Sequence, residues 1–207
     1  MSRETRLEGD GTVAPEQVLT VMRAEAEPLF AVLDAARERR MLKLLQGAGE
    51  PFESLYEGEE GKELAEVAPY LVSLPKDSAL LEQLMRSGWG RSWGLFLTSR
   101  LPFKETRRHL RKFLMIEDAS TGKQLYFRFY DPRVLRMFLP TCTAEQRTEF
   151  LGRLGSILAE GEKGEVLRVQ GAEVSSARAS RTTTTPAVLA AGSAMRRRLT
   201  SANPRAP

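Results

Sequence analysis

The sequence predicts an α/β fold: a single compact domain of alternating short strands and helices, followed by a disordered C-terminal tail. Short runs of consecutive apolar residues alternate with stretches in which apolar residues recur every three or four positions, and this alternation predicts the domain. Hydrophobic residues make up 42% of the 207 residues, which is enough to build a core. The tail is predicted because the residues after Val169 are mostly Ser, Thr, Ala, Gly, Pro and Arg, which bury too little surface to offset the entropy of ordering.

The first part of the domain is marked by continuous apolar runs and by prolines. The run from Leu29 to Leu33 is typical of a buried strand, and Asp34 closes it. Pro15 can begin a helix, and Pro28 ends that element. The elements expected up to residue 74 are, in order, a helix from Pro15, a strand at Leu29–Leu33, a helix at Arg37–Gln46, a strand at Phe52–Tyr56, a helical turn around Lys62–Val67 and a strand at Tyr70–Leu74.

The second part begins with the segment Pro75–Ser78, which predicts a helix N-cap. Leu125, Phe127 and Phe129 alternate with polar residues, and this period of two predicts a strand. The elements expected here are, in order, a helix that Gly88 stops, a strand at Trp93–Thr98, a long basic helix from Phe103 to about Ile116, a strand at Lys123–Tyr130, and helices at Val134–Leu139 and Ala144–Leu158.

These elements place the domain at residues 15–160. Residues 1–14 are expected to be a disordered N-terminus, and residues 161–207 a low-complexity basic tail that is also disordered. The alternation of elements leaves the order and the direction of the strands open.

Composition excludes several classes of protein. The single cysteine, Cys142, cannot form a disulfide within the chain, and with a single histidine, His109, it cannot supply a Cys/His zinc cage. We therefore expect no metal site and no cofactor. The chain lacks the roughly 20 consecutive apolar residues that a membrane-spanning helix needs, and residues 1–10 lack the apolar core of a signal peptide. A cytoplasmic protein with no membrane partner is expected.

The net charge of +4 raises the question of a nucleic-acid partner. The segment from Gly171 to Pro207 contains six arginines and one acidic residue, so the basic excess belongs to the tail and the rest of the chain is close to neutral. A domain-wide basic footprint for DNA or RNA is therefore absent from the sequence. Binding of nucleic acid or of an anionic surface by the basic helix 104–116 and the Arg-rich tail remains the less favoured alternative.

The first conspicuous motif is the segment Gly88–Gly94, with the sequence GWGRSWG. Its glycine spacing matches neither GxGxxG nor GxxxxGK(S/T), the patterns of phosphate-binding loops. The segment precedes a predicted strand, whereas a dinucleotide-binding fingerprint follows one. The glycines permit tight turns, and tryptophan side chains bury large areas. We expect Trp89, Arg91 and Trp93 to serve either core packing or the binding of a partner protein.

The second motif is the segment Phe127–Leu135, with the sequence FRFYDPRVL. Arg128, Asp131 and Arg133 are expected to cluster at the end of the predicted strand, while the aromatic residues, Tyr130 among them, pack an inner face. Arginine binds carboxylates through two parallel hydrogen bonds, so these arginines can brace the fold against acidic residues or bind the acidic residues of a partner. The sequence leaves both alternatives open.

Candidate catalytic groups lack the neighbours that catalysis requires. His109 lies in a basic helix with no orienting acid and no nucleophile indicated beside it. Cys142 precedes a helix, where a lowered thiol pKa is conceivable, but a packing role is the simpler interpretation. Carboxylates such as Asp34, Glu53 and Glu57 near strand ends are not visibly paired for acid–base chemistry. We do not expect an enzyme.

Five segments, taken in order, resemble a known family. They are Leu29–Ala36, Ser54–Gly58, Ala68–Val72, Gly88–Gly94 and Phe127–Leu135. Together they resemble the type VI secretion effector chaperones, also called adaptors, over about residues 29–155. The resemblance implies a non-catalytic protein that binds an effector (a toxin) and the VgrG spike, so that the effector is mounted before firing. It also places Trp89, Arg91 and Trp93, and Arg128, Tyr130, Asp131 and Arg133, on the best-marked motifs of the family. Longer relatives carry a C-terminal lobe thought to help choose the cargo, and here a short Arg-bearing tail stands in its place.

Overall fold

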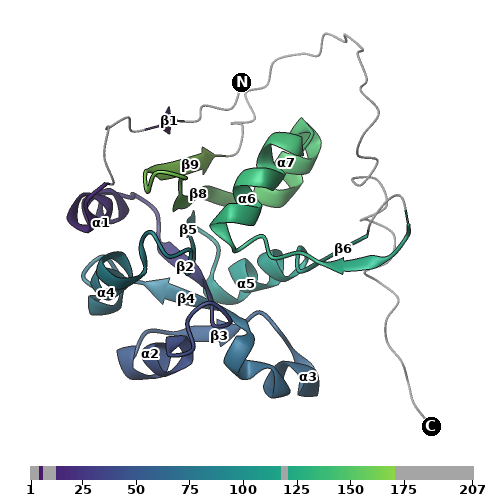
Figure 1. Cartoon of the computed structure of the whole chain (residues 1–207), viewed down its shortest axis with the longest axis horizontal. Coiled ribbons are helices and arrows are strands. Elements are labelled where there is room, and N and C mark those ends of the chain that lie inside the picture. Colours follow the sequence, from purple (N-terminus) through teal and green to yellow (C-terminus); the bar gives the residue numbers. More distant parts are fainter. Residues whose placement is uncertain (1–4, 7–12, 118–120, 171–207) are drawn as a thin grey trace.

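An antiparallel sheet forms the centre of the protein in the computed structural model, which describes residues 5–6, 13–117 and 121–170 (Figure 1). The strand order is β1-β9-β8-β5-β2-β4-β3, and every neighbouring pair is antiparallel. A separate antiparallel hairpin consists of β6 and β7. The strands are β1 (Thr5–Arg6), β2 (Leu29–Asp34), β3 (Phe52–Ser54), β4 (Pro69–Leu74), β5 (Gly94–Ser99), β6 (Met115–Glu117), β7 (Gln124–Tyr126), β8 (Leu154–Glu160) and β9 (Val166–Gln170).

Helices connect most of these strands. They are α1 (Pro15–Arg23), α2 (Met41–Ala48), α3 (Gly58–Glu63), α4 (Ala79–Gly88), α5 (Phe103–Arg111), α6 (Pro132–Phe138) and α7 (Ala144–Leu151), with short 3₁₀ helices η1 (Ala65–Val67) and η2 (Leu139–Thr141). The α/β fold class predicted from the sequence is confirmed, and the described residues form a single compact domain.

Side-chain caps explain where three of the helices begin. The Ser78 hydroxyl accepts a hydrogen bond from the backbone N–H of Leu81 and caps α4, as the sequence predicts. Thr143 forms a capping box with Gln146 at the start of α7. The Asp131 carboxylate caps α6, whose first residue is proline.

The sheet is covered on both faces, so the domain has three layers (Figure 1). Along β2, the side chains of Leu29, Ala31 and Leu33 pack against α1, α2 and α4, while Phe30 and Val32 pack against α5, α6 and α7. Successive side chains of a strand point to opposite faces, which explains why the continuous apolar run is buried throughout. Full burial of each large apolar side chain stabilises the fold by about 1.5–3 kcal/mol relative to exposure.

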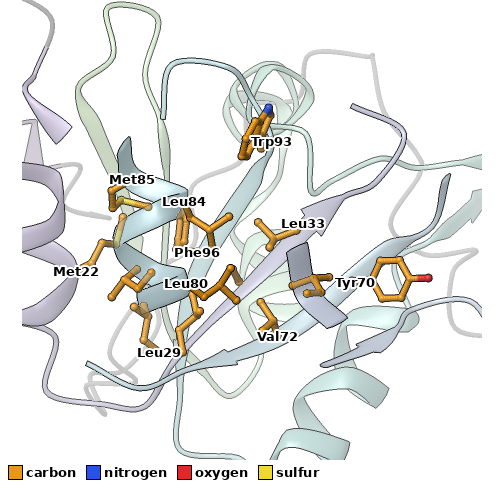
Figure 2. Packing of buried hydrophobic residues seen from close by; sticks show 14 of the residues in the cluster. Met22, Leu29, Leu33, Tyr70, Val72, Leu80, Leu84, Met85, Trp93 and Phe96 are labelled. Atoms are coloured by element: carbon orange, nitrogen blue, oxygen red, sulfur yellow. The ribbon is translucent and has the colours of Figure 1, made fainter. Parts of the chain in front are cut away.

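Trp93 belongs to the cluster that includes α1, α2 and α4, and its side chain is buried. Figure 2 shows its ring at the end of the cluster where Leu33 lies, with Leu29 at the other end. This ring therefore closes the core at the end of the sheet where β2 finishes.

The strand predicted at Lys123–Tyr130 is wrong in extent. Only Gln124–Tyr126 is a strand, and it pairs with β6 in a hairpin outside the main sheet. Leu125 is 46% exposed, whereas Phe127 and Phe129 are buried. The alternating pattern arises from a short exposed strand followed by an extended segment that inserts two rings into the core, which a period of two does not distinguish from one strand. The basic helix also ends earlier than expected, at Arg111, because β6 follows it.

The helix predicted at Ala144–Leu158 is correct only as far as Leu151. Residues 154–160 form β8 instead, beside the central strand β5. The expected domain boundary at 160 falls inside the β8–β9 hairpin, so residues 161–170 belong to the domain and not to the tail. Over so short a run, the apolar residues of 154–158 fit the period of a helix as well as that of a strand. Pairing with β5 determines that they form a strand.

The disorder predicted for residues 1–14 and for the rest of the tail falls largely outside the described residues, which leave out 1–4, 7–12 and 171–207. In the described part of the chain, no helix combines the length and the apolar character needed to cross a membrane.

Candidate functional site

The two motif segments lie together at one end of the sheet. The last residues of β2 pair with the first residue of β5, Leu33 with Gly94, and β8 ends beside the same part of β5 because Phe96 pairs with Leu158. We call this end, with Asp34 and Glu160 at the ends of β2 and β8, the Asp34 end of the sheet. The GWGRSWG segment leads into β5 here, and the FRFYDPRVL segment leads into α6.

The GWGRSWG segment is held by its two tryptophans. Trp93 is only 8% exposed, and the Trp89 indole N–H donates to the Gly164 carbonyl oxygen in the β8–β9 turn at 2.8 Å. A Cβ at Gly88 would lie 2.5 Å from Cε3 of Trp93, and a Cβ at Gly94 would overlap the Val32 carbonyl oxygen. These two glycines therefore serve close packing.

The FRFYDPRVL segment is anchored by aromatic side chains. Phe127, Phe129 and Tyr130 are all buried, and the Phe129 ring makes edge contacts with Tyr130 and with Phe150. Burial, with Tyr56 close by, raises the pKa of the Tyr130 hydroxyl, so Tyr130 is a neutral packing residue at physiological pH. The rings hold the charged residues between and after them in place.

Arg128 forms an ion pair with the fully buried carboxylate of Asp34. Partial burial disfavours the charge on Arg128, but the hydrogen bond to Asp34 outweighs this and raises the guanidinium pKa. The guanidinium also lies 5.9 Å from the centre of the Tyr130 ring. The Arg128 side chain remains 42% exposed, so the acidic partner is inside and the basic partner faces solvent.

Arg133 and Asp131 form a second pair of the same kind. Arg133 donates to the Asp131 carboxylate from Nε at 3.0 Å and from Nη2 at 2.6 Å, and its backbone N–H donates to the same carboxylate. Burial opposes ionisation of Asp131, but these hydrogen bonds prevail and lower its pKa. The Arg133 side chain is 50% exposed, while that of Asp131 is 3% exposed.

Two buried acidic residues connect the first motif segment to the second motif segment and to α6. Asp34 pairs with Arg128 through its side chain and donates its backbone N–H to the Trp93 carbonyl oxygen at 2.8 Å. Glu160 accepts at Oε2 from the backbone N–H of Ser92 at 2.9 Å, and its backbone oxygen accepts from Nη1 of Arg136 at 2.5 Å. Burial raises the pKa of Glu160, although backbone N–H groups of the 90–92 turn partly oppose this.

The structure thus brings together all seven residues singled out in the sequence, and it assigns them different positions. Trp93, Tyr130 and Asp131 are buried, Trp89 is partly buried, and the arginines Arg91, Arg128 and Arg133 reach the surface. Sequence reasoning named Asp34 without a partner and did not single out Glu160. The burial of the whole run before Asp34 is the one signal that could have marked it.

The other candidate groups are held in structural contacts. His109 Nε2 lies 2.9 Å from the Phe150 carbonyl oxygen, and burial lowers the pKa of the ring. Burial raises the pKa of the Cys142 thiol, whose sulfur lies 3.4 Å from the Phe138 carbonyl oxygen. The surroundings of Cys142, just before α7, therefore do not favour an activated thiol, which needs a lowered pKa. Among the described residues, no group of three or more His, Cys, Asp or Glu side chains is placed to hold a metal ion.

The basic helix α5 is partly engaged within the domain. Arg107 donates to the carbonyl oxygens of Ser54 and Tyr56 and pairs with Glu57 at 2.8 Å. Arg111 donates to the Leu55 carbonyl oxygen and also pairs with Glu57. The exposed basic side chains of this helix and its end are Lys104, Arg108 and Lys112. The cationic face available to an anionic ligand is therefore smaller than the sequence indicates.

The model of a family described as "Domain of unknown function (DUF4123)" matches residues 29–149. The match covers more than half of the chain and spans both motif segments, and it ends before β8 begins. Comparisons with curated proteins and with solved structures gave no match.

Proposed function

The chain belongs to the DUF4123 family, and on this premise we propose that it is a non-catalytic adaptor of a type VI secretion system. It binds an effector in the cytoplasm and helps to load that effector onto the VgrG spike. It needs no cofactor or metal for this role, because its task is to hold two proteins together.

The observation that carries the proposal is the meeting of the two motif segments at the Asp34 end of the sheet, within the part of the chain that the family model matches. Buried carboxylates behind Arg128 and Arg133 hold both guanidiniums at the surface. A rigid surface with fixed hydrogen-bond donors suits the recognition of another protein, since less side-chain entropy is lost on binding.

The experiment that tests the proposal is co-purification. The tagged full chain is co-expressed with the VgrG-like spike protein and the candidate effectors encoded by its source, then washed at moderate salt. A complex of defined stoichiometry on size-exclusion chromatography is the expected result. If the chain elutes alone with every candidate and instead retains RNA, the adaptor proposal is wrong and binding of nucleic acid becomes the better hypothesis.

A matched pair of variants makes the result specific. Arg153 lies in the turn before β8, at the opposite end of the sheet, and is exposed, so Arg153→Glu changes the charge without touching either motif. Arg91→Glu makes the same change within the first motif, where the side chain is also exposed. We expect the complex to survive Arg153→Glu.

A further inference from the structure

The Asp34 end of the sheet gathers arginines that reach the surface from three separate segments of the chain. Arg37, Arg39 and Arg40 follow β2, Arg91 precedes β5, Arg128 precedes α6, and Arg133 lies within α6. We call these six residues the arginine cluster. Two contacts connect the segments: Arg37 Nη2 donates to the Arg91 carbonyl oxygen at 3.3 Å, and Arg128 pairs with Asp34, three residues before Arg37.

Carboxylates that contact the segments of the cluster lie beneath the arginines, whereas Glu66 before β4 and Glu162 in the β8–β9 turn are exposed at the same end of the sheet. Asp34, Asp131 and Glu160 are 0%, 2% and 5% exposed. Glu38 pairs with Arg40 at 3.2 Å, and its side chain is 18% exposed, against 82% for Arg40. Within the cluster the charges are therefore layered, with carboxylates inside and guanidiniums outside, and a partner approaching the cluster meets mainly guanidinium groups.

The arginines at the centre of the cluster keep unused hydrogen-bond donors. A guanidinium has five N–H donors. Arg133 uses Nε and one Nη2 hydrogen for Asp131, and Arg128 uses Nη2 for Asp34. Both side chains are about half exposed, so their remaining donors face the surface in fixed positions. Such donors match the two oxygens of a carboxylate.

From this layering we propose that the arginine cluster is the docking surface for an acidic segment of the partner protein, whose Asp and Glu carboxylates bind the exposed guanidiniums. The proposal rests on the adaptor function above and names the chemistry of its partner. Charge complementarity alone suits carboxylates and phosphates alike, but the number of free cations favours a protein, since three of the six arginines are paired with carboxylates of the chain itself. The buried carboxylates already offset much of the arginine charge, whereas binding to a phosphate backbone depends on several unneutralised cations.

The test compares Arg37→Glu/Arg91→Glu with Arg153→Glu/Arg108→Glu, which reverses two exposed charges at other sites. Neither Arg37 nor Arg91 belongs to an ion pair in the described part of the chain, so both double variants should fold, and thermal melting checks this. Affinity for the partner that co-purifies with the wild type is measured by calorimetry. We expect the cluster variant to bind at least about tenfold more weakly and the control to stay within about twofold.

A charge swap completes the test. Replacing the acidic residues of the partner segment by lysine should restore binding to the Arg37→Glu/Arg91→Glu variant. If the folded cluster variant binds the partner as tightly as wild type, the docking proposal is wrong while the adaptor function stands. If no partner binds the wild-type chain at all, the adaptor function itself fails and the docking proposal fails with it.

Two probes distinguish carboxylate from phosphate recognition: an oligoglutamate peptide and an RNA oligonucleotide of equal charge. We expect the wild-type chain to bind the peptide through the cluster, so that Arg37→Glu/Arg91→Glu abolishes peptide binding. If the wild-type chain binds the RNA but not the peptide, and the cluster variant loses the RNA binding, the choice of an acidic protein is wrong.

Discussion

Asp34 is the residue on which the candidate site depends most. Its carboxylate is fully buried, pairs with Arg128 and accepts the backbone N–H of Ala36 at 3.0 Å. A buried charge without a partner is strongly unfavourable, so the pair is most informative when one member is removed. The ion pair between Arg128 and Asp34 therefore stabilises the fold and also fixes the position of the exposed Arg128 guanidinium.

The first prediction concerns this pair. We expect Arg128→Ala to lower the free energy of unfolding by about 1–3 kcal/mol, below the cost for a fully buried pair because water reaches Arg128. Asp34→Asn keeps an acceptor for the Ala36 N–H and removes the charge, so Arg128→Ala should cost much less in that background. Urea unfolding of the four proteins in this double-mutant cycle measures the coupling. Equal costs of Arg128→Ala in both backgrounds would show that the pair does not stabilise the fold.

The second prediction concerns Glu160 and pH. Burial raises the folded-state pKa of Glu160 above its unfolded value, so the folded protein binds this proton more tightly than the unfolded chain does. Its contribution to stability is therefore greatest below the unfolded pKa and is lost as the pH rises through the folded pKa. Glu160→Gln keeps an acceptor for the Ser92 N–H and removes this titration.

We expect wild type to become less stable relative to Glu160→Gln as the pH rises from the ordinary pKa of a glutamate, 4.5, towards neutrality. Thermal unfolding of the two proteins across that range checks the prediction. The lowered pKa of Asp131 acts in the opposite direction, since its stabilisation is lost as the pH falls, but it is common to both proteins and cancels in the difference. Parallel stability curves would contradict the assignment.

At the scale of elements, the β8–β9 hairpin changes the extent of the domain. β8 pairs with the central strand β5, and β9 pairs with β8. Val166 and Val169 of β9 are buried, one in each core cluster, and the turn between the strands receives the Trp89 indole hydrogen bond. Arg168 also pairs with Glu25 after α1. The hairpin thus contacts both core clusters and, through the Trp89 hydrogen bond, the first motif segment.

The third prediction follows from these contacts. A chain ended after residue 170 should fold cooperatively, whereas a chain ended after residue 160, the boundary expected from the sequence, should not. Loss of two buried valines alone removes about 3–6 kcal/mol, which is comparable with the whole stability of many domains. Thermal melting followed by circular dichroism compares the two chains. Equal melting temperatures would show that β9 is dispensable.

At the scale of the molecule, the three-layer fold separates two basic regions. The arginine cluster lies at the Asp34 end of the sheet, the exposed face of α5 carries Lys104 and Arg108, and the six arginines of residues 171–207 belong to the sequence outside the described part. The adaptor proposal and the nucleic-acid alternative depend on different members of this set. Removal of residues 171–207 therefore distinguishes the adaptor proposal from the nucleic-acid alternative.

The fourth prediction is that a chain ended after residue 170 binds its protein partner with an affinity within about twofold of the full chain. Any binding of RNA by the full chain should weaken in the shortened chain and should fall steeply with salt, because it depends on phosphate contacts. Fluorescence anisotropy with labelled RNA and calorimetry with the partner, each at two salt concentrations, provide the comparison. Loss of the protein partner on shortening would place its binding site in the Arg-rich segment.

Much of the local structure was predictable from local patterns. The buried run Leu29–Leu33 and the Ser78 cap both depend on residues within a few positions of one another, and both are confirmed. The errors at Lys123–Tyr130 and Ala144–Leu158 occurred where the period of a short apolar run suits more than one element. There, pairing with a distant strand, or its absence, determines the conformation.

The sequence by itself determined the fold class, most of the elements and the two segments that form the candidate site. Only the tertiary structure decided the strand order, the membership of β8 and β9 in the sheet, and the partners of the charged residues. The physical reason is distance along the chain. Arg128 and Asp34 are 94 positions apart, and Ser92 and Glu160 are 68 apart. Local propensity carries no information about such pairs, because they form only when packing of the whole domain brings the ends of β2 and β8 to the start of β5.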